Sequence, residues 1–464
     1  MNPREKELAE RSLWPLILKY SLPAIIGMLV NALYNVVDRF YIGRIPNIGA
    51  DALSGLGVTF PIICAVLAFT LLIGIGGASC ISIRLGKKDR EGAEEVLGNV
   101  LSSAAAVSVM LSAAGILFAD NALRFFGASD VTIVYASPYL KTYFTGTFFF
   151  VTGVAVNHSL RGSGSPYVSA TTQVLGAVLN VILDPVFIFV FDMGVEGAAI
   201  ATVISQAASF CWVMANAFSK KNTVRLRVKY LRPRLRILLR IASIGISPFL
   251  LQLAASAVNI VANHALKTYG GDNAIGAMTV ISSVSTLFVM PLFGLNQGLQ
   301  PILGYNYGAE NYGRVKHALR HQMTLATAHL TLCYAVVMLA PSALVEFFIL
   351  KSRESENLIQ LATTGLPIFM LVLPLLGFQI PATNYFQSIG KAGVAIVVTL
   401  LRQVILLIPL YILLPRFFGM RGIWYAAPVS DSIAFLISAA VMEFERRRLA
   451  ALPAPPEPVK GARA

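Results

Sequence analysis

The sequence predicts an all-α integral membrane protein whose 12 transmembrane helices form two six-helix lobes, related by a pseudo-twofold axis along the membrane normal. Of the 464 residues, 56% are hydrophobic and only 13% are charged. The mean hydropathy of +0.70 leaves too little polar surface for a soluble domain of this size. Apolar runs of about 20 residues, the length that crosses a bilayer, recur along the whole chain. Lys and Arg residues gather in alternate connections between those runs.

The apolar runs divide the chain into spans and connections. A mixed-charge segment over 1–15 is predicted to be an amphipathic cytoplasmic leader. The N-lobe, over 16–217, contains spans at 16–42, 53–81, 96–118, 139–160, 168–191 and 195–217. After a basic inter-lobe loop over 218–236, the C-lobe over 237–442 contains spans at 237–262, 274–303, 323–344, 358–378, 394–414 and 422–441. A cytoplasmic tail over 443–464, rich in Pro and Ala from residue 453 onward, is predicted to be disordered.

The positions of the positive charges predict the topology. With the N-terminus inside, 27 of the 37 Lys and Arg residues fall on the cytoplasmic side, nine fall outside, and Arg402 lies within a span. The positive-inside rule therefore predicts that both termini are cytoplasmic. We expect a multi-pass protein of the plasma (inner) membrane, monomeric and in contact with membrane lipids. The net charge of +14 is explained by this topology, so no nucleic-acid partner is expected.

The two halves of the chain resemble each other. Pro23 aligns with Pro248, and after a three-residue gap a constant offset of 222 residues relates Ala52, Val58, Gly76 and Gly86 to Ala274, Val280, Gly298 and Gly308. An even number of spans in each half makes the repeat parallel, so its axis lies along the membrane normal.

The absence of catalytic motifs narrows the class of function. The sequence has no Gly-x-x-x-x-Gly-Lys-Ser/Thr phosphate loop, no His-Glu-x-x-His and no Gly-x-Ser-x-Gly, so neither nucleotide hydrolysis nor another enzyme activity is expected. Two lobes with a site between them favour ion-driven secondary transport by alternating access. We expect no cofactor, and we expect Na⁺ or H⁺ as the coupling ion. A lipid flippase and a channel are the alternatives.

The most informative residue is Asp184, which lies inside the apolar run 176–191. A carboxylate at membrane depth costs about 2.5–3.5 kcal/mol on insertion scales, so it indicates a functional site. Asn180 lies one helical turn before it, on the same face, and Asp38 and Thr202 lie at a similar depth in their own spans. These four residues offer oxygen ligands for Na⁺, or could equally hold a shared proton. Pro185 is expected to kink the span beside them.

Two further groups of residues are candidates for lesser roles. Met28, Asn31 and Tyr34 share a helical face with Asp38 because they are spaced three or four residues apart, which predicts a substrate cavity for an apolar cation. Arg402 and Asp431 are the buried charges of the second half. A structural ion pair is the preferred interpretation of these two residues, and a role in ion coupling is the alternative.

At these residues the chain resembles the multidrug and toxic compound extrusion (MATE) family. The resemblance covers about residues 12–442 and is carried by the stretches Arg161–Pro166, Leu179–Pro185, Gly194–Ala199 and Gly298–Gly308. It implies a V-shaped antiporter that exports amphipathic, often cationic drugs, as in antibiotic resistance, in exchange for Na⁺ or H⁺.

The resemblance also implies roles for individual residues. It assigns ion coupling to Asp38, Asn180, Asp184 and Thr202, and it places Asn31 and Asn157 near the cavity. A second branch of the family has its acidic residues in the C-lobe, on spans 7 and 10. Here span 7 carries Gln252 and span 10 has no interior acid, so the N-lobe branch fits better. The same superfamily includes flippases of lipid-linked sugars.

Overall fold

The computed structural model describes residues 3–45, 48–220, 222–348 and 356–451, and these residues form helices and short connections without a β-strand. The first half contains α1 (Pro3–Glu10), α2 (Leu13–Gly43), α3 (Gly49–Gly86), α4 (Arg90–Phe125), α5 (Ile133–Gly162), α6 (Pro166–Pro185), the π-helix η1 (Val186–Val190) and α7 (Gly194–Phe218). The second half contains η2 (Val228–Tyr230), α8 (Leu235–Gly308), α9 (Tyr312–Leu339), α10 (Pro341–Phe348), α11 (Glu356–Phe369), α12 (Leu373–Ser388), α13 (Ala392–Leu400), the π-helix η3 (Leu401–Leu407), α14 (Ile408–Phe418) and α15 (Met420–Ala451).

The predicted twelve-span fold is confirmed. Ten helical stretches of the described chain are long and apolar enough to cross a membrane, and α11 with α12, bent by 57°, makes an eleventh. Helix α5 provides the twelfth. It is 30 residues long, but its polar buried residues, among them Asn157, His158 and Arg161, lower its hydropathy.

Several predicted boundaries differ from the observed ones. The predicted connection between spans 7 and 8 is a single break in α8 at Gly271, whose φ of 65° is readily adopted only by glycine. Span 10 extends beyond residue 378 to Ser388. The predicted disordered tail is helical over 443–451, because Glu443 pairs with Arg446 and Arg447 one turn away. Residues 452–464 of that tail lie outside the described residues.

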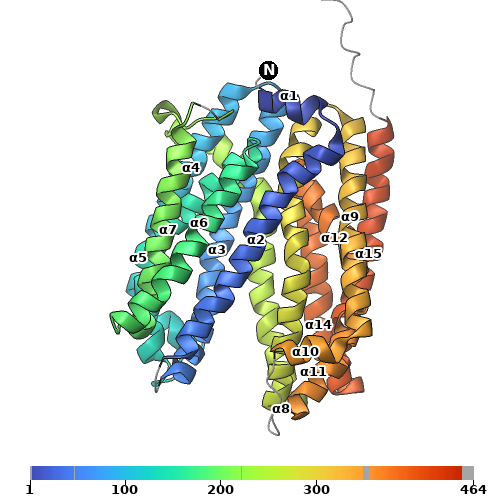
Figure 1. The fold of residues 1–464 in the computed structure, drawn as a ribbon. Helices are drawn as coiled ribbons and strands as arrows, with labels where there is room; N and C mark the ends of the chain where they lie inside the picture. Colours follow the sequence, from blue (N-terminus) through green and yellow to red (C-terminus); the bar gives the residue numbers. More distant parts are fainter. Residues whose placement is uncertain (1–2, 46–47, 221, 349–355, 452–464) are drawn as a thin grey trace, which may run out of the picture.

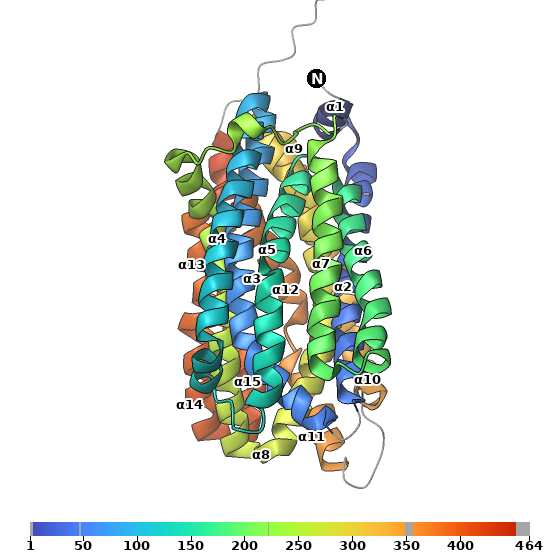
Figure 2. The same ribbon diagram turned by 90° about the vertical axis from the view of Figure 1, so that its left-hand side faces the viewer.

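The helices form two groups that meet at one end of the molecule. Figure 1 shows α2–α7 and α8–α15 close together at the end that carries α1 and diverging toward the opposite end. In the view of the first group in Figure 2, α5, α6 and α7 lie side by side. The described chain therefore has the two-lobe, V-shaped arrangement that the sequence predicts.

The lobes meet through close contacts between backbones of α3 and α8. A Cβ atom added to Gly86 would lie 2.0 Å from the carbonyl oxygen of Tyr305, and one added to Gly308 would lie 2.2 Å from that of Ile83. The offset of 222 residues converts Gly86 into Gly308 and Ile83 into Tyr305, so each contact is the image of the other. Such a reciprocal contact is what a twofold axis between the two helices requires.

The segment before α2 is folded onto the lobes at the end where they meet. The carboxylate of Glu7 accepts hydrogen bonds from Lys19, at 2.6 and 2.8 Å, and from Arg11. Partial burial would raise the pKa of Glu7, but these two cations outweigh burial and hold its pKa below the ordinary value. Arg314 of α9 donates to the backbone oxygen of Leu8 at 3.2 Å. The predicted leader is thus a short helix, α1, tied to both lobes.

We expect the substitution Gly86→Val to destabilise the protein by about 1–3 kcal/mol or more, because the added atoms overlap the backbone of α8. The measurement is the midpoint of thermal unfolding of the purified protein. Gly57→Val on the same helix is the control, since no neighbouring atom lies within 4 Å of an added Cβ there. Equal losses for both variants would contradict the proposed backbone contact.

Candidate functional site

Helix α6 positions the two most deeply buried polar residues of the predicted coupling site. It starts with Pro166 in its first turn, where the missing N–H costs nothing, and it ends at Pro185. The α-helical hydrogen bonding ends at Pro185 because a proline has no N–H to donate. The chain then continues without a break as the π-helix η1. Asp184 and Asn180 are 0% and 2% exposed. Their spacing of four residues places both on the same face of α6.

Three of the four predicted coupling residues are in direct contact. The amide Nδ2 of Asn180 donates to Oδ1 of Asp184 at 3.0 Å and to Oγ1 of Thr202, on α7, at 3.3 Å. The other carboxylate oxygen of Asp184 and the amide oxygen of Asn180 are buried and, within the described ranges, accept no hydrogen bond. Buried acceptors without donors are costly in a protein interior. The arrangement therefore leaves oxygen atoms available to a cation or a proton.

Asp38 lies on α2, which packs against α6. Its charge is within electrostatic reach of Asp184, and its side chain is half-buried. Two carboxylates that interact in a medium of low dielectric constant favour the binding of one positive charge between them. The described residues contain no group of three or more His, Cys, Asp and Glu side chains fit for a metal ion. Ion binding here would therefore also use amide and hydroxyl oxygens.

Two tyrosines of α5 also lie at this site, and the sequence analysis missed them. Tyr139 is 7% exposed and within electrostatic reach of both Asp38 and Asp184. Tyr143, one turn further along, is equally buried and lies near Tyr34. Its hydroxyl has no hydrogen-bond partner in the part of the chain that the structure describes. The sequence signal that could have found them is their spacing of four residues near the start of span 4, which places both hydroxyls on one face of that helix.

The predicted substrate-cavity residues fall into two places. Tyr34 lies near Tyr139 and Tyr143, and Asn31, one turn earlier on α2, is exposed. Met28 instead accepts a hydrogen bond on Sδ from Gln297 of α8, at 3.2 Å.

Asn157 lies with Met28 in a second polar network. It donates to the backbone oxygen of Ser169 at 3.3 Å. Ser169 lies about 16 Å from Asn180 along α6, at ~1.5 Å per residue. At the centre of this network is Arg161, which is 1% exposed and donates to Gln297 at 2.6 Å. His158 is a further partner of Arg161. Because α5 and α8 belong to different lobes, Arg161 links the two lobes near the end where they meet.

The second predicted pair of charges, Arg402 and Asp431, is also in contact. Nε of Arg402, on η3, lies 2.9 Å from Oδ1 of Asp431, on α15. Ser430 donates to the backbone oxygen of Arg402 at 2.9 Å, which satisfies one acceptor of the π-helix. The contact joins two sequential spans of the C-lobe. Its structural role, as opposed to a role in coupling, stays a prediction.

We expect Arg402→Met alone to lower thermal stability, by up to about 3–5 kcal/mol, because it leaves a buried carboxylate without its partner. The double variant Arg402→Met with Asp431→Leu should recover much of this loss and keep transport activity. Thermal unfolding and transport by the same preparations are the measurements. Stable single variants that fail only in ion coupling would contradict the structural role.

Two repeated lobes of helices long and apolar enough to cross a membrane, with a buried acidic cluster in one of them, are typical of membrane transporters. The sequence profile of the MatE family matches residues 23–186 and again residues 239–413, one match in each lobe. The chain therefore belongs to the MatE family, and the resemblance noted in the sequence is confirmed.

Known relatives and solved structures agree with this assignment. The chain is 27% identical over 440 residues to the multidrug export protein MepA of Staphylococcus haemolyticus, which covers 95% of both chains. It is similar in structure to a MOP superfamily transporter from Pyrococcus furiosus, with a TM-score of 0.90, 25% identity and coverage of 97% of this chain and 99% of that chain. It is also similar to a MATE transporter in complex with MaD3S, with a TM-score of 0.89, 25% identity and the same coverage.

Proposed function

We propose that this chain is a secondary active antiporter of the plasma (inner) membrane. It exports amphipathic or cationic drugs or toxic metabolites in exchange for Na⁺ or H⁺ by alternating access. The observation that carries the proposal is the contact of fully buried Asp184 with Asn180, with the charge of Asp38 within reach. The multidrug export function of the MepA relatives supports the substrate class.

The acidic cluster accounts for the exchange. With no cation bound, two carboxylates repel each other at low dielectric constant, so the empty site binds Na⁺ or a proton favourably. Release of that ion restores the negative charge, and a cationic substrate in the same lobe then becomes the favourable occupant. Ion and substrate therefore bind alternately, which couples the gradient of one to the movement of the other.

The shape of the molecule fits one state of the transport cycle. With both termini in the cytoplasm, as the positive-inside rule predicts, the lobes meet on the cytoplasmic side and diverge outward (Figure 1). Alternating access then requires the contacts at the meeting end to separate. These include the Gly86 and Gly308 backbone contacts and the bond from Arg161 to Gln297.

A flippase of lipid-linked sugar or lipid is the competing function within the superfamily, and the Pyrococcus transporter is described as having a binding pocket of reversed polarity. A flippase needs basic residues around its groove to hold a pyrophosphate. The site in this N-lobe instead carries two acids. Accumulation of a substrate against its gradient would exclude a channel.

We expect Asp184→Asn to abolish coupled efflux while the protein still folds and inserts, because the neutral amide removes an ion ligand and also a desolvation cost. The measurement is export of a cationic dye from proteoliposomes under an imposed Na⁺ or pH gradient. Asp130→Asn is the control, since that carboxylate is 90% exposed. Normal gradient-driven export by the folded Asp184→Asn protein would refute the assignment.

Asp38 and Asp184 should behave as one unit. If they share an ion or a proton, the double variant Asp38→Asn with Asp184→Asn should transport scarcely less than either single variant. The comparison uses transport rates converted into free energies. A double variant whose loss equals the sum of two independent losses would show that the carboxylates act separately.

A further inference from the structure

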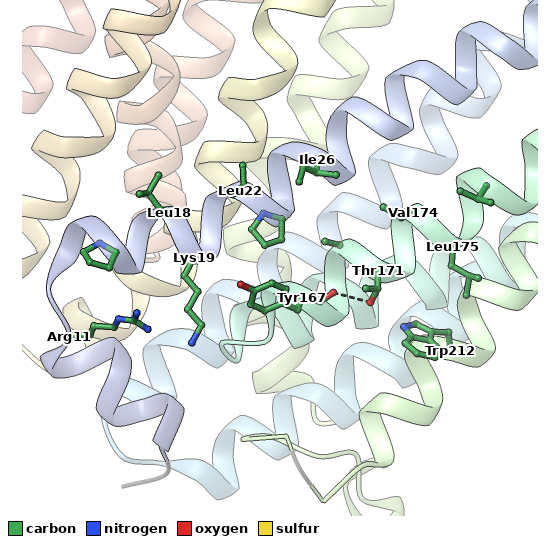
Figure 3. A pocket seen from close by; sticks show the side chains of 14 residues that line it. Arg11, Leu18, Lys19, Leu22, Ile26, Tyr167, Thr171, Val174, Leu175 and Trp212 are labelled. Carbon is green, nitrogen blue, oxygen red and sulfur yellow. Dashed lines mark hydrogen bonds between the residues drawn. The ribbon is translucent and has the colours of Figure 1, made fainter.

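A wide groove runs along the membrane-facing side of the N-lobe, between α2, α6 and α7 (Figure 3). Its volume is about 1160 Å³, above the ~300–1,000 Å³ of a usual small-molecule pocket. The wall is formed by apolar side chains from the three helices: Leu18, Leu22, Pro23, Ile26, Ala170, Val174, Leu175, Val178 and Trp212. Leu18 and Leu22 are more than half exposed. The groove thus offers a long apolar surface that is open to the membrane.

One end of this groove is positively charged. Arg11 and Lys19 line it at the start of α2. A small pocket that adjoins it, sharing Lys19 and Tyr167, is also lined by Arg4 and Glu7. Arg4 donates to the neutral acceptors Ser165 and Asn222 at 2.6 and 2.8 Å, so hydrogen bonding leaves its charge in place. The charged residues lining the two cavities are therefore three cations and one carboxylate, Glu7, which pairs with both Arg11 and Lys19. A net positive charge of two remains.

The charged end lies at a defined depth. Arg11 and Lys19 precede or begin α2, Tyr167 begins α6, and Trp212 lies near the end of α7. All are near the end of the molecule that carries α1, where the sequence places most of the positive charge. Tyr and Trp side chains are typical of the boundary between headgroups and acyl chains. The cations therefore lie at headgroup level and the apolar wall lies at acyl-chain level.

We propose that the groove binds one anionic phospholipid from the leaflet at this end of the protein, with its phosphate on Arg11 and Lys19 and an acyl chain along Leu22, Ile26, Val174 and Val178. The charge complements an anionic headgroup, and basic pockets between transmembrane helices are suited to such lipids. The wall is apolar and open along three helices, which suits an acyl chain. The site stands independently of the transport activity proposed above.

The test measures lipid binding by the full-length protein. Native mass spectrometry and thermal unfolding are compared in detergent with added phosphatidylglycerol or phosphatidylcholine. We expect phosphatidylglycerol to bind and stabilise, and Arg11→Gln with Lys19→Gln to weaken its binding at least tenfold. The matched control is Arg232→Gln with Arg236→Gln, which removes the same charge from exposed positions outside the groove. Equal loss in the control would overturn the site in favour of general surface charge.

Two further variants separate lipid binding from a merely structural role of the cations. Glu7→Gln removes the carboxylate that competes for Arg11 and Lys19, so it should strengthen phosphatidylglycerol binding. Val174→Trp should fill the apolar wall and weaken binding without changing any charge. If Glu7→Gln instead weakens binding as the arginine and lysine substitutions do, the cations only hold α1 in place and the proposal fails.

Other occupants give distinct results in the same assay. Equal binding of phosphatidylcholine would show that the headgroup charge is not recognised. Equal stabilisation by inorganic phosphate alone would show an anion site without a lipid. Tighter binding of tetraphenylphosphonium after removal of Arg11 and Lys19, with no change for phosphatidylglycerol, would identify a drug pathway. Each of these three results overturns the proposal.

Discussion

The closeness of the backbones of α3 and α8 is the constraint on which the rest of this structure depends. At Gly86 and Gly308 the two helices approach so closely that a methyl group would overlap a carbonyl oxygen of the partner helix. In a membrane, where lipid is as apolar as leucine, such close packing is a main source of helix association. The close contacts of α3 with α8 also include Gly76 with Ile241 and Gly245 with Leu72, and all of them lie in the half of α3 that ends at Gly86. The lobes can therefore diverge beyond that half. The V-shape thus follows from where the small residues lie along two helices.

The acidic cluster lies far from that constraint. Asp184 is about 27 Å along α6 from Pro166, at ~1.5 Å per residue, and Pro166 lies near the end where the lobes meet. The two ends of the N-lobe are therefore chemically different. One end holds Arg161 in a network with Gln297 of the other lobe, and the other holds two acids and two tyrosines. The acidic cluster and the bond that joins Arg161 to the other lobe therefore lie at opposite ends of the N-lobe.

The sequence was sufficient to predict the architecture because the signals used are averaged over many residues. They are the hydropathy of whole spans, the positive charge of whole connections and the 222-residue offset between the two halves. It was also sufficient to bring Asn180 and Asp184 together, because a spacing of four residues on one helix determines a contact. The contact of Asn180 with Thr202 depends on how α6 packs against α7. The sequence showed only that the two residues lie at a similar depth in the membrane. Tyr139 and Tyr143 were missed because an aromatic residue in a span usually serves only to pack helices together. The tail boundary was wrong because local ion pairs extend α15 beyond the apolar region.

The C-lobe shows the same scaffold with a buried acid, Asp431, paired to a base. Asn263 takes the position of Asp38 in the repeat. Several amides lie between α8, α9 and α12: Gln322 donates to Asn296 at 2.6 Å, and Asn384 donates to the backbone oxygen of Asn296 at 3.2 Å. The charges of Arg402 and Asp431 offset each other. Amides are neutral and need no cation to balance a charge, whereas two neighbouring carboxylates do. This asymmetry in charge between two lobes of the same fold supports the coupling site that we propose in the N-lobe.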